Sequence, residues 1–155
     1  SNNTNVGTAT VTVTAVADGN YTGTLTDTFE ITEKNWGNPT VSKIEAQKYT
    51  GSKVEPSDFT VTLSDKTVLT KDVDYELSYE NNVKVGTTAS VVISPKGNYK
   101  GNDITRTFEI VAGDIKEAKI DAIPDQIYTG AEITPEFSVS INGTVLTPNI
   151  DYTAI

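Results

Sequence analysis

The sequence predicts an all-β fold made of antiparallel β-sandwiches in tandem. Three observations support this prediction: apolar residues alternate with threonine and other polar residues, turn sequences separate the alternating runs, and a pattern of about 79 residues repeats along the chain. Alternation places the apolar side chains on one face of a strand and the polar side chains on the other. No segment has the apolar spacing of an amphipathic helix.

The repeated motifs define a unit of about 79 residues, which is a common length for one domain. The matching motifs are Val6-Gly7-Thr8 with Val85-Gly86-Thr87, Gly19-Asn20-Tyr21 with Gly97-Asn98-Tyr99, Phe29-Glu30-Ile31 with Phe108-Glu109-Ile110, Tyr49-Thr50-Gly51 with Tyr128-Thr129-Gly130, and Asp74-Tyr75 with Asp151-Tyr152. We therefore expect residues 1–34 to form the C-terminal half of one repeat, residues 35–113 a complete repeat, and residues 114–155 the N-terminal half of the next repeat.

The expected strands follow from the alternating runs, whose inward-facing residues can be read in chain order. These sets are Val11, Val13 and Ala15; Leu25, Phe29 and Ile31; Phe59, Val61 and Leu63; Tyr75, Leu77 and Tyr79; Ala89, Val91 and Ile93; Phe108 and Ile110; and Phe137, Val139 and Ile141. Their high content of β-branched residues suits a half-buried pleated surface.

Turn sequences lie between these runs. Asn142-Gly143 predicts a two-residue hairpin turn, because both residues tolerate a positive φ. Its counterpart in the complete repeat is the longer Ser64-Asp65-Lys66. Pro56 and Pro135 occupy matching places, where we expect them to mark strand starts or edges.

Composition excludes several classes of function. The 12 Lys and Arg residues against 21 Asp and Glu residues give a net charge of -9, which argues against binding nucleic acid or anionic lipid. No apolar run approaches the roughly 20 residues of a membrane span, so we expect no membrane insertion in this segment. Cysteine and histidine are absent, which excludes disulfides, thiolate chemistry and a catalytic triad that contains histidine. We expect no enzyme activity, no cofactor and no bound metal.

The order of the motifs Tyr49-Thr50-Gly51, Asp74-Tyr75, Gly97-Asn98-Tyr99 and Phe108-Glu109-Ile110 resembles the tandem immunoglobulin-like repeats of secreted or wall-attached bacterial surface proteins of Gram-positive type. The resemblance covers nearly the whole chain. It implies immunoglobulin-like sandwiches located outside the cell or on its surface, which serve as stalks and spacers and in some cases as adhesive or sugar-binding modules. It provides no catalytic residue to transfer.

We therefore expect a non-enzymatic structural segment of a bacterial surface protein or an extracellular fibre. The alternative is an adhesin-type module that binds glycans or a host surface protein. Trp36, the single tryptophan, lies in a junction between repeats, where its ring either stacks on a ligand or packs between neighbouring repeats. The seven tyrosines likewise form either a glycan-binding face or part of the core. Asp65, Asp72 and Asp74 surround one loop, but their spacing matches no calcium-binding loop, which favours solvated turn residues.

Each repeat half has only about 40 residues, which is too few to bury a stable core alone. The apolar residues left to be covered are Val11, Val13, Leu25, Phe29 and Ile31 in the first half and Phe137, Val139, Ile141 and Tyr152 in the last half. They can be covered by adjacent repeats of the same parent chain, by pairing of the two halves within one chain, or by head-to-tail pairing between copies. Head-to-tail pairing resembles donor-strand complementation and produces a filament unless it closes into a ring.

Overall fold

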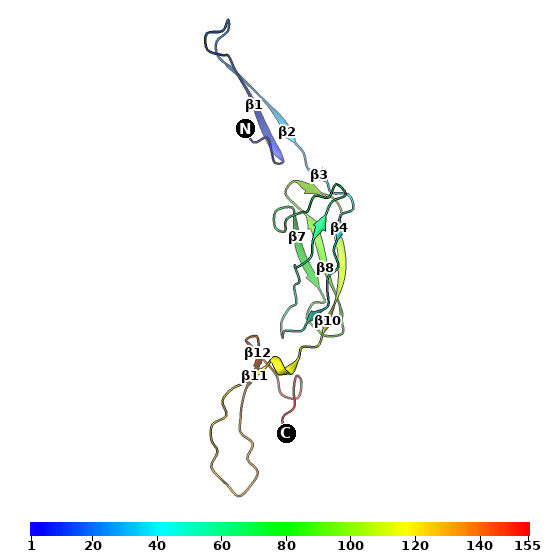
Figure 1. The fold of residues 1–155 in the computed structure, drawn as a ribbon, viewed down its shortest axis with the longest axis vertical. Helices are drawn as coiled ribbons and strands as arrows, with labels where there is room; N and C mark the ends of the chain where they lie inside the picture. Colours follow the sequence, from blue (N-terminus) through cyan, green and yellow to red (C-terminus); the bar gives the residue numbers. More distant parts are fainter. The chain divides into compact units, whose positions relative to one another are not determined.

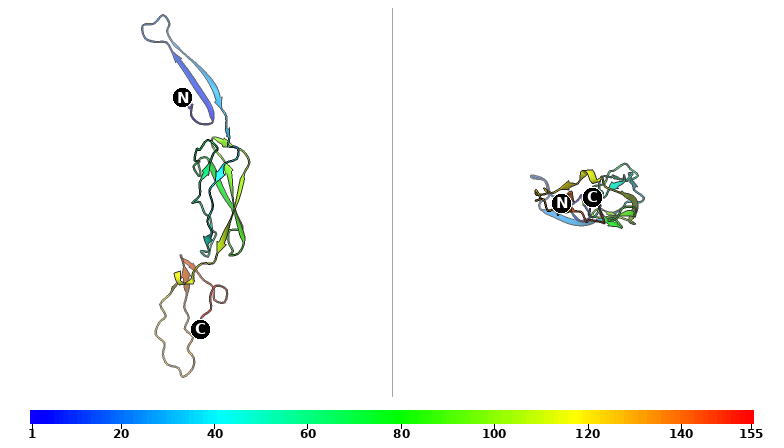
Figure 2. Two further views of the ribbon diagram at one scale, coloured as in Figure 1. Left: turned by 45° about the vertical axis from the view of Figure 1, so that its right-hand side comes forward. Right: turned by 90° about the horizontal axis from the view of Figure 1, so that it is seen from below.

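The computed structural model describes residues 1–155 and consists of short and medium β-strands joined by turns (Figure 1). The all-β prediction is confirmed, since the helical structure is limited to one 3-10 turn, η1 (Ile115–Glu117). No helix is long and apolar enough to span a membrane. Figure 2 shows the same strands from two further directions.

The contacts within the chain define two compact units, and each unit is built from separate segments. The first unit comprises Ser1–Lys43, Asp58–Ser78 and Val92–Thr105, and the second comprises Ile44–Ser57, Tyr79–Val91 and Arg106–Ile155. This division does not follow the repeat boundaries expected after residues 34 and 113, which therefore remain a prediction.

The first unit begins with an antiparallel pair of long strands, β1 (Gly7–Thr14) and β2 (Thr24–Ile31). In this register Ala9 lies opposite Phe29, Val11 opposite Asp27, and Val13 opposite Leu25, so one face of the pair is apolar except for Asp27. The opposite face carries threonine almost throughout, namely Thr8, Thr10, Thr12, Thr14, Thr24, Thr26 and Thr28.

Several two-residue strands follow in two further pairs. β3 (Lys34–Asn35) is parallel to β9 (Tyr99–Lys100), and β4 (Thr40–Val41) is antiparallel to β6 (Val61–Thr62). Val61 is fully buried, as its place in an inward-facing set predicted. Each pair thus joins segments that are far apart in the sequence.

The largest sheet has four strands in the order β5-β10-β8-β7. Its strands are β5 (Gln47–Lys48), β7 (Tyr75–Glu80), β8 (Thr88–Pro95) and β10 (Ile104–Val111). β5 is parallel to β10, with Ile110 opposite Gln47. Alternate residues of β8 and β10 are buried, namely Ala89, Val91, Ile93, Phe108 and Ile110, which confirms the predicted inward-facing sets.

The last part of the chain forms a three-stranded antiparallel sheet from β11 (Lys119–Ile120), β12 (Val139–Ile141) and β13 (Thr144–Val145). Asn142 (φ 48°) and Gly143 (φ 83°) connect β12 to β13, which confirms the predicted two-residue turn. A small apolar cluster lies against this sheet and contains Val139, Ile141 and Leu146, with Ala118, Phe137 and Tyr152 packed around it.

The turn around Asp74 recurs around Asp151 in the last part of the chain with the same hydrogen bonds. The carboxylate of Asp74 accepts from the backbone N–H of Thr70 at 2.8 Å, and that of Asp151 accepts from the N–H of Thr147 at 2.7 Å. The two turns also share a positive φ at equivalent places, 66° at Asp72 and 63° at Asn149. The repeated sequence motif therefore produces the same local backbone structure in both places.

Candidate functional site

The apolar face of the β1–β2 pair is exposed in the structure. Val11, Val13, Leu25 and Phe29 are exposed, and Ile31 is half-buried. β1 and β2 form a sheet of two strands only, so no further strand covers the outer edge of β2. The face therefore combines exposed apolar side chains with an unpaired strand edge, a combination that favours strand addition.

The edge of β1 is partly occupied by the amino terminus of the chain. The N–H of Thr10 donates to the carbonyl oxygen of Ser1 at 2.9 Å, and the terminal ammonium of Ser1 donates to the carbonyl oxygen of Thr10 at 2.7 Å. The outer edge of β2 has no comparable strand neighbour. An added strand is thus better accommodated beside β2 than beside β1.

The last part of the chain holds the other half of the predicted complementation residues. The structure brings Phe137, Val139, Ile141 and Tyr152 together in one cluster, and the rings of Phe137 and Tyr152 have centroids 6.2 Å apart. By contrast, residues 121–134 contain no strand and are exposed throughout. This segment includes Ile127 and Tyr128, whose side chains are 87% and 88% exposed.

Trp36 packs inside the first unit rather than at an open surface. Its side chain is only 4% exposed, and its indole N–H donates to the carbonyl oxygen of Asn102 at 3.1 Å. A Cβ atom at Gly101 would collide with the indole ring, so the glycine makes room for it. A ring enclosed in this way presents no free face for stacking on a sugar.

Asn98 forms hydrogen bonds to the amino-terminal segment that its sequence motif did not predict. Its side-chain oxygen accepts from the N–H of Val6 at 2.8 Å, and its side-chain nitrogen donates to the Asn5 side-chain oxygen at 2.9 Å. Its backbone carbonyl accepts from the N–H of Lys34 at 2.9 Å. The recurrence of Gly-Asn-Tyr at residues 19–21 and 97–99 was the available signal, although it did not reveal the partners.

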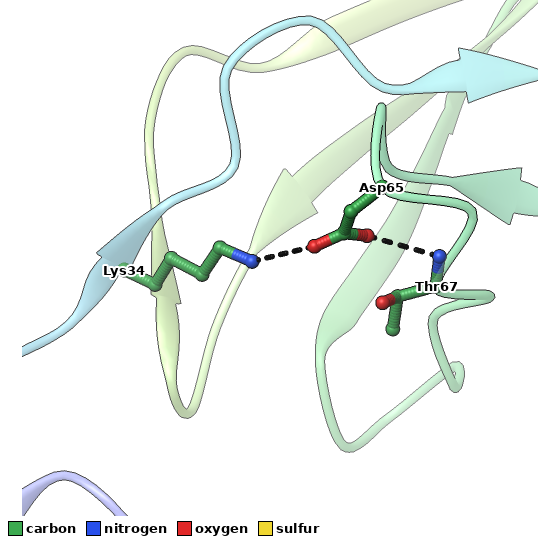
Figure 3. Close-up of polar contacts among 3 residues, drawn as sticks. All are labelled: Lys34, Asp65 and Thr67. Carbon is green, nitrogen blue, oxygen red and sulfur yellow. Dashed lines mark hydrogen bonds and ion pairs between the residues drawn. The ribbon is translucent and has the colours of Figure 1, made fainter.

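The acidic residues considered as calcium ligands have separate partners. Lys34 donates to one oxygen of Asp65 at 2.9 Å, and the N–H of Thr67 donates to the other at 3.0 Å (Figure 3). The hydrogen bond from Lys34 holds the pKa of Asp65 well below its usual range, and the same bond raises the pKa of Lys34. Asp72 pairs with Lys71 at 2.7 Å. No group of three or more acidic residues is arranged to hold a metal ion.

The tyrosines divide into covered and exposed members. Tyr75 is buried, and burial raises its pKa. Tyr79 is half-buried, and its hydroxyl donates to the carbonyl oxygen of Pro56 at 2.8 Å. Tyr21 and Tyr128 are exposed instead. Because some of the tyrosines are buried and others are exposed, the seven tyrosines do not share one exposed aromatic face.

Comparison of the chain with protein-family models, with curated proteins and with solved structures finds no match.

Proposed function

We propose that this chain is a non-enzymatic segment of a bacterial surface protein or extracellular fibre, in which tandem immunoglobulin-like repeats act as a stalk or spacer. The observation that carries the proposal is the recurrence of one turn, with the same Asp-to-backbone hydrogen bond at Asp74 and Asp151. A unit that folds in the same way wherever its motif recurs is suited to stacking in an array.

The arrangement of strands supports the immunoglobulin-like assignment of the complete repeat. A four-stranded sheet and the β4–β6 pair supply strands for the two layers of a sandwich. The hydroxyl of Tyr79 bonds to backbone at Pro56, which resembles the tyrosine corner of such domains. Burial of Val61, Val91 and Ile93 provides the apolar core that a sandwich requires.

An extracellular or cell-surface location is consistent with the composition. The net charge of -9 favours solubility and mutual repulsion between neighbouring stalks. A chain without cysteine keeps the same covalent structure in oxidising surroundings, since it has no thiol to react. Neither feature depends on a ligand.

Small-angle X-ray scattering tests the stalk proposal. Two copies of the 155-residue chain joined in series should have nearly twice the maximum dimension of one copy, because repeats in a stalk add length. A joined pair that collapses to a compact particle would contradict the proposal. The same experiment at two salt concentrations separates stiffness from charge repulsion, which salt screens.

The alternative is an adhesin-type module, and the exposed ring of Tyr21 is the observation that favours it. A glycan array probed with the chain and with a Tyr21→Ala variant tests this alternative. Binding that the substitution abolishes would support a sugar-binding module, because an exposed aromatic ring is a stacking platform. Absence of binding by both proteins would leave the stalk as the better proposal.

A further inference from the structure

We propose that a second copy of this chain completes the β1–β2 pair by adding residues 126–128 as a parallel strand beside the end of β2. The exposed apolar face of β1 and β2 then becomes part of the contact between the two copies. The proposal rests on the proposed tandem-repeat function and specifies the partner and the register of the contact.

The complete repeat provides the template for this register. There β5 pairs in parallel with β10, with Ile110 opposite Gln47 and Val111 opposite Lys48. The N–H of Tyr49 extends the pairing by donating to the carbonyl oxygen of Val111 at 2.9 Å. A short parallel strand beside the last residues of β10 is therefore part of the finished repeat.

The repeat motifs transfer this register to the open strand. Phe29-Glu30-Ile31 matches Phe108-Glu109-Ile110, so the end of β2 corresponds to the end of β10. Tyr128-Thr129-Gly130 matches Tyr49-Thr50-Gly51, so residues 126–128 correspond to residues 47–49. The expected partners are Ile31 with Gln126 and Thr32 with Ile127, followed by a hydrogen bond from the N–H of Tyr128 to the carbonyl oxygen of Thr32.

Both surfaces of the proposed contact are unoccupied in the single chain. β2 pairs with β1 alone, and residues 126–128 belong to no strand. Ile127 and Tyr128 are almost fully exposed, whereas their counterpart segment at residues 47–49 is paired. A segment that is a strand in the complete repeat thus lacks its partner in the last part of the chain.

A second copy is the occupant that we propose because this chain carries, in residues 126–128, the counterpart of residues 47–49. β2 and residues 126–128 belong to different compact units and are not paired with each other within one molecule. Each copy therefore offers one open hairpin and one free strand segment. Such a pair of unlike surfaces forms a head-to-tail contact, which propagates from copy to copy.

Disulfide trapping tests the register, since the chain has no cysteine of its own. Thr32→Cys is introduced in one preparation and Ile127→Cys in another that carries a mass tag. Neighbouring strands lie about 4.8 Å apart, which falls within the Cα separation of about 4.4–6.8 Å that a disulfide tolerates. Mixing the two preparations under mild oxidation should give a dimer of intermediate mass.

Two matched variants calibrate the yield. Val111→Cys combined with Lys48→Cys in one chain places the thiols at the observed counterpart of the proposed pair and sets the expected maximum. Thr12→Cys, on the threonine face of the hairpin, replaces Thr32→Cys as the mismatched partner. We expect the Thr32–Ile127 dimer to exceed the Thr12–Ile127 dimer at least tenfold, with a yield that rises with protein concentration.

Equal yields from the matched and mismatched partners would overturn the proposal. A chain carrying both Thr32→Cys and Ile127→Cys that forms its disulfide within a monomer at low concentration would also overturn it, because the occupant would then be the same molecule. Circular dichroism of each variant confirms that the fold is retained.

The scattering experiment keeps the two proposals distinguishable. A joined pair that doubles in length without any matched crosslink would retain the stalk and eliminate pairing between copies. A matched crosslink with a compact joined pair would retain pairing between copies and eliminate the stalk.

Discussion

The β1–β2 pair and the β8–β10 pair have the same pattern of sequence but opposite exposure. Val13, on the apolar face of β1, is 60% exposed, whereas Ile93, on the inward face of β8, is fully buried. Phe29 is 46% exposed, whereas its counterpart Phe108 is 4% exposed. The alternation of apolar and polar residues is therefore sufficient to pair two strands, but burial of their apolar face depends on the rest of the repeat. The difference in exposure is the one that the proposed tandem-repeat arrangement predicts for a core face that lacks its cover.

The largest expected difference between the two pairs is in the effect of removing a phenylalanine ring. Phe108→Ala should lower the free energy of unfolding by about 3–5 kcal/mol, because it leaves a cavity in a packed core. Phe29→Ala should lower it by less than about 1 kcal/mol in the unassembled chain, because the ring is already half in water. Urea unfolding followed by the fluorescence of Trp36 measures both values. Similar losses in the two variants would show that the face of β1 and β2 is covered after all.

A second comparison concerns the junction residues Trp36 and Ile115, which occupy equivalent places. Trp36 is buried and Ile115 is exposed. Trp36→Ala should cost about 3–5 kcal/mol, and Ile115→Ala about 0.5 kcal/mol. Trp36→Phe is the matched control, since it keeps an aromatic ring but removes the hydrogen bond to Asn102. Loss of this hydrogen bond should lower the free energy of unfolding by about 1 kcal/mol, in addition to any loss of packing. Thermal unfolding followed by circular dichroism gives all three values, and a larger loss at Ile115 than at Trp36 would reverse the comparison.

The recurrent turn allows the same substitution to be made twice. Asp74→Ala and Asp151→Ala each remove the acceptor of a backbone N–H, which should cost about 0.5–2 kcal/mol of local stability. Hydrogen exchange at the amides of Thr70 and Thr147 reports each loss separately. Asp→Asn at either position retains an acceptor and serves as the control. Faster exchange at only one of the two amides would mean that the turns are not equivalent.

The smallest expected effect is a pH dependence at Asp65. Because Lys34 lowers the pKa of this carboxyl in the folded chain, the pair adds stability above the usual Asp pKa of about 3.9. That contribution is lost as the pH falls through the lowered pKa. Asn142 stands at the equivalent place in the last part of the chain, so no such dependence is expected there.

Carbon NMR of the Asp65 carboxyl measures this pKa directly. Lys34→Met should raise it toward the ordinary value, although the N–H of Thr67 continues to favour the ionised form. Thr67→Ala is the matched comparison, because it retains the backbone N–H but removes the Thr67 hydroxyl, which also lowers the pKa of Asp65. An unchanged pKa in the Lys34→Met variant would show that the ion pair does not persist in solution.

The sequence predicted those parts of the fold that depend on local pattern. The all-β class, the alternate burial along β8 and the turn at Asn142-Gly143 follow from residue spacing and from the tolerance of positive φ. The exposure of Val11, Val13, Leu25 and Phe29 agrees with the expectation for a repeat half, while their role in complementation stays a prediction.

Other features of the fold could not be predicted, because they depend on contacts between distant segments or on strands too short to show a pattern. The enclosure of Trp36 requires the space left by Gly101, which lies far from it in the chain. The contacts of Asn98 require Val6 and Asn5 to approach it from another segment. The short strands β3, β5 and β9 have only two residues each, too few for a pattern of alternation to be recognised.

The threonine face of the β1–β2 pair has a consequence for the surroundings in which the hairpin is soluble. Its hydroxyl groups carry no charge and both donate and accept hydrogen bonds, so their hydration does not change with pH or ionic strength. The solubility of the remainder of the molecule depends on an excess of carboxylates, and salt screens the repulsion between them. At high salt or in acid, the uncharged hydroxyls of this face remain hydrated, whereas the electrostatic repulsion between the carboxylates weakens.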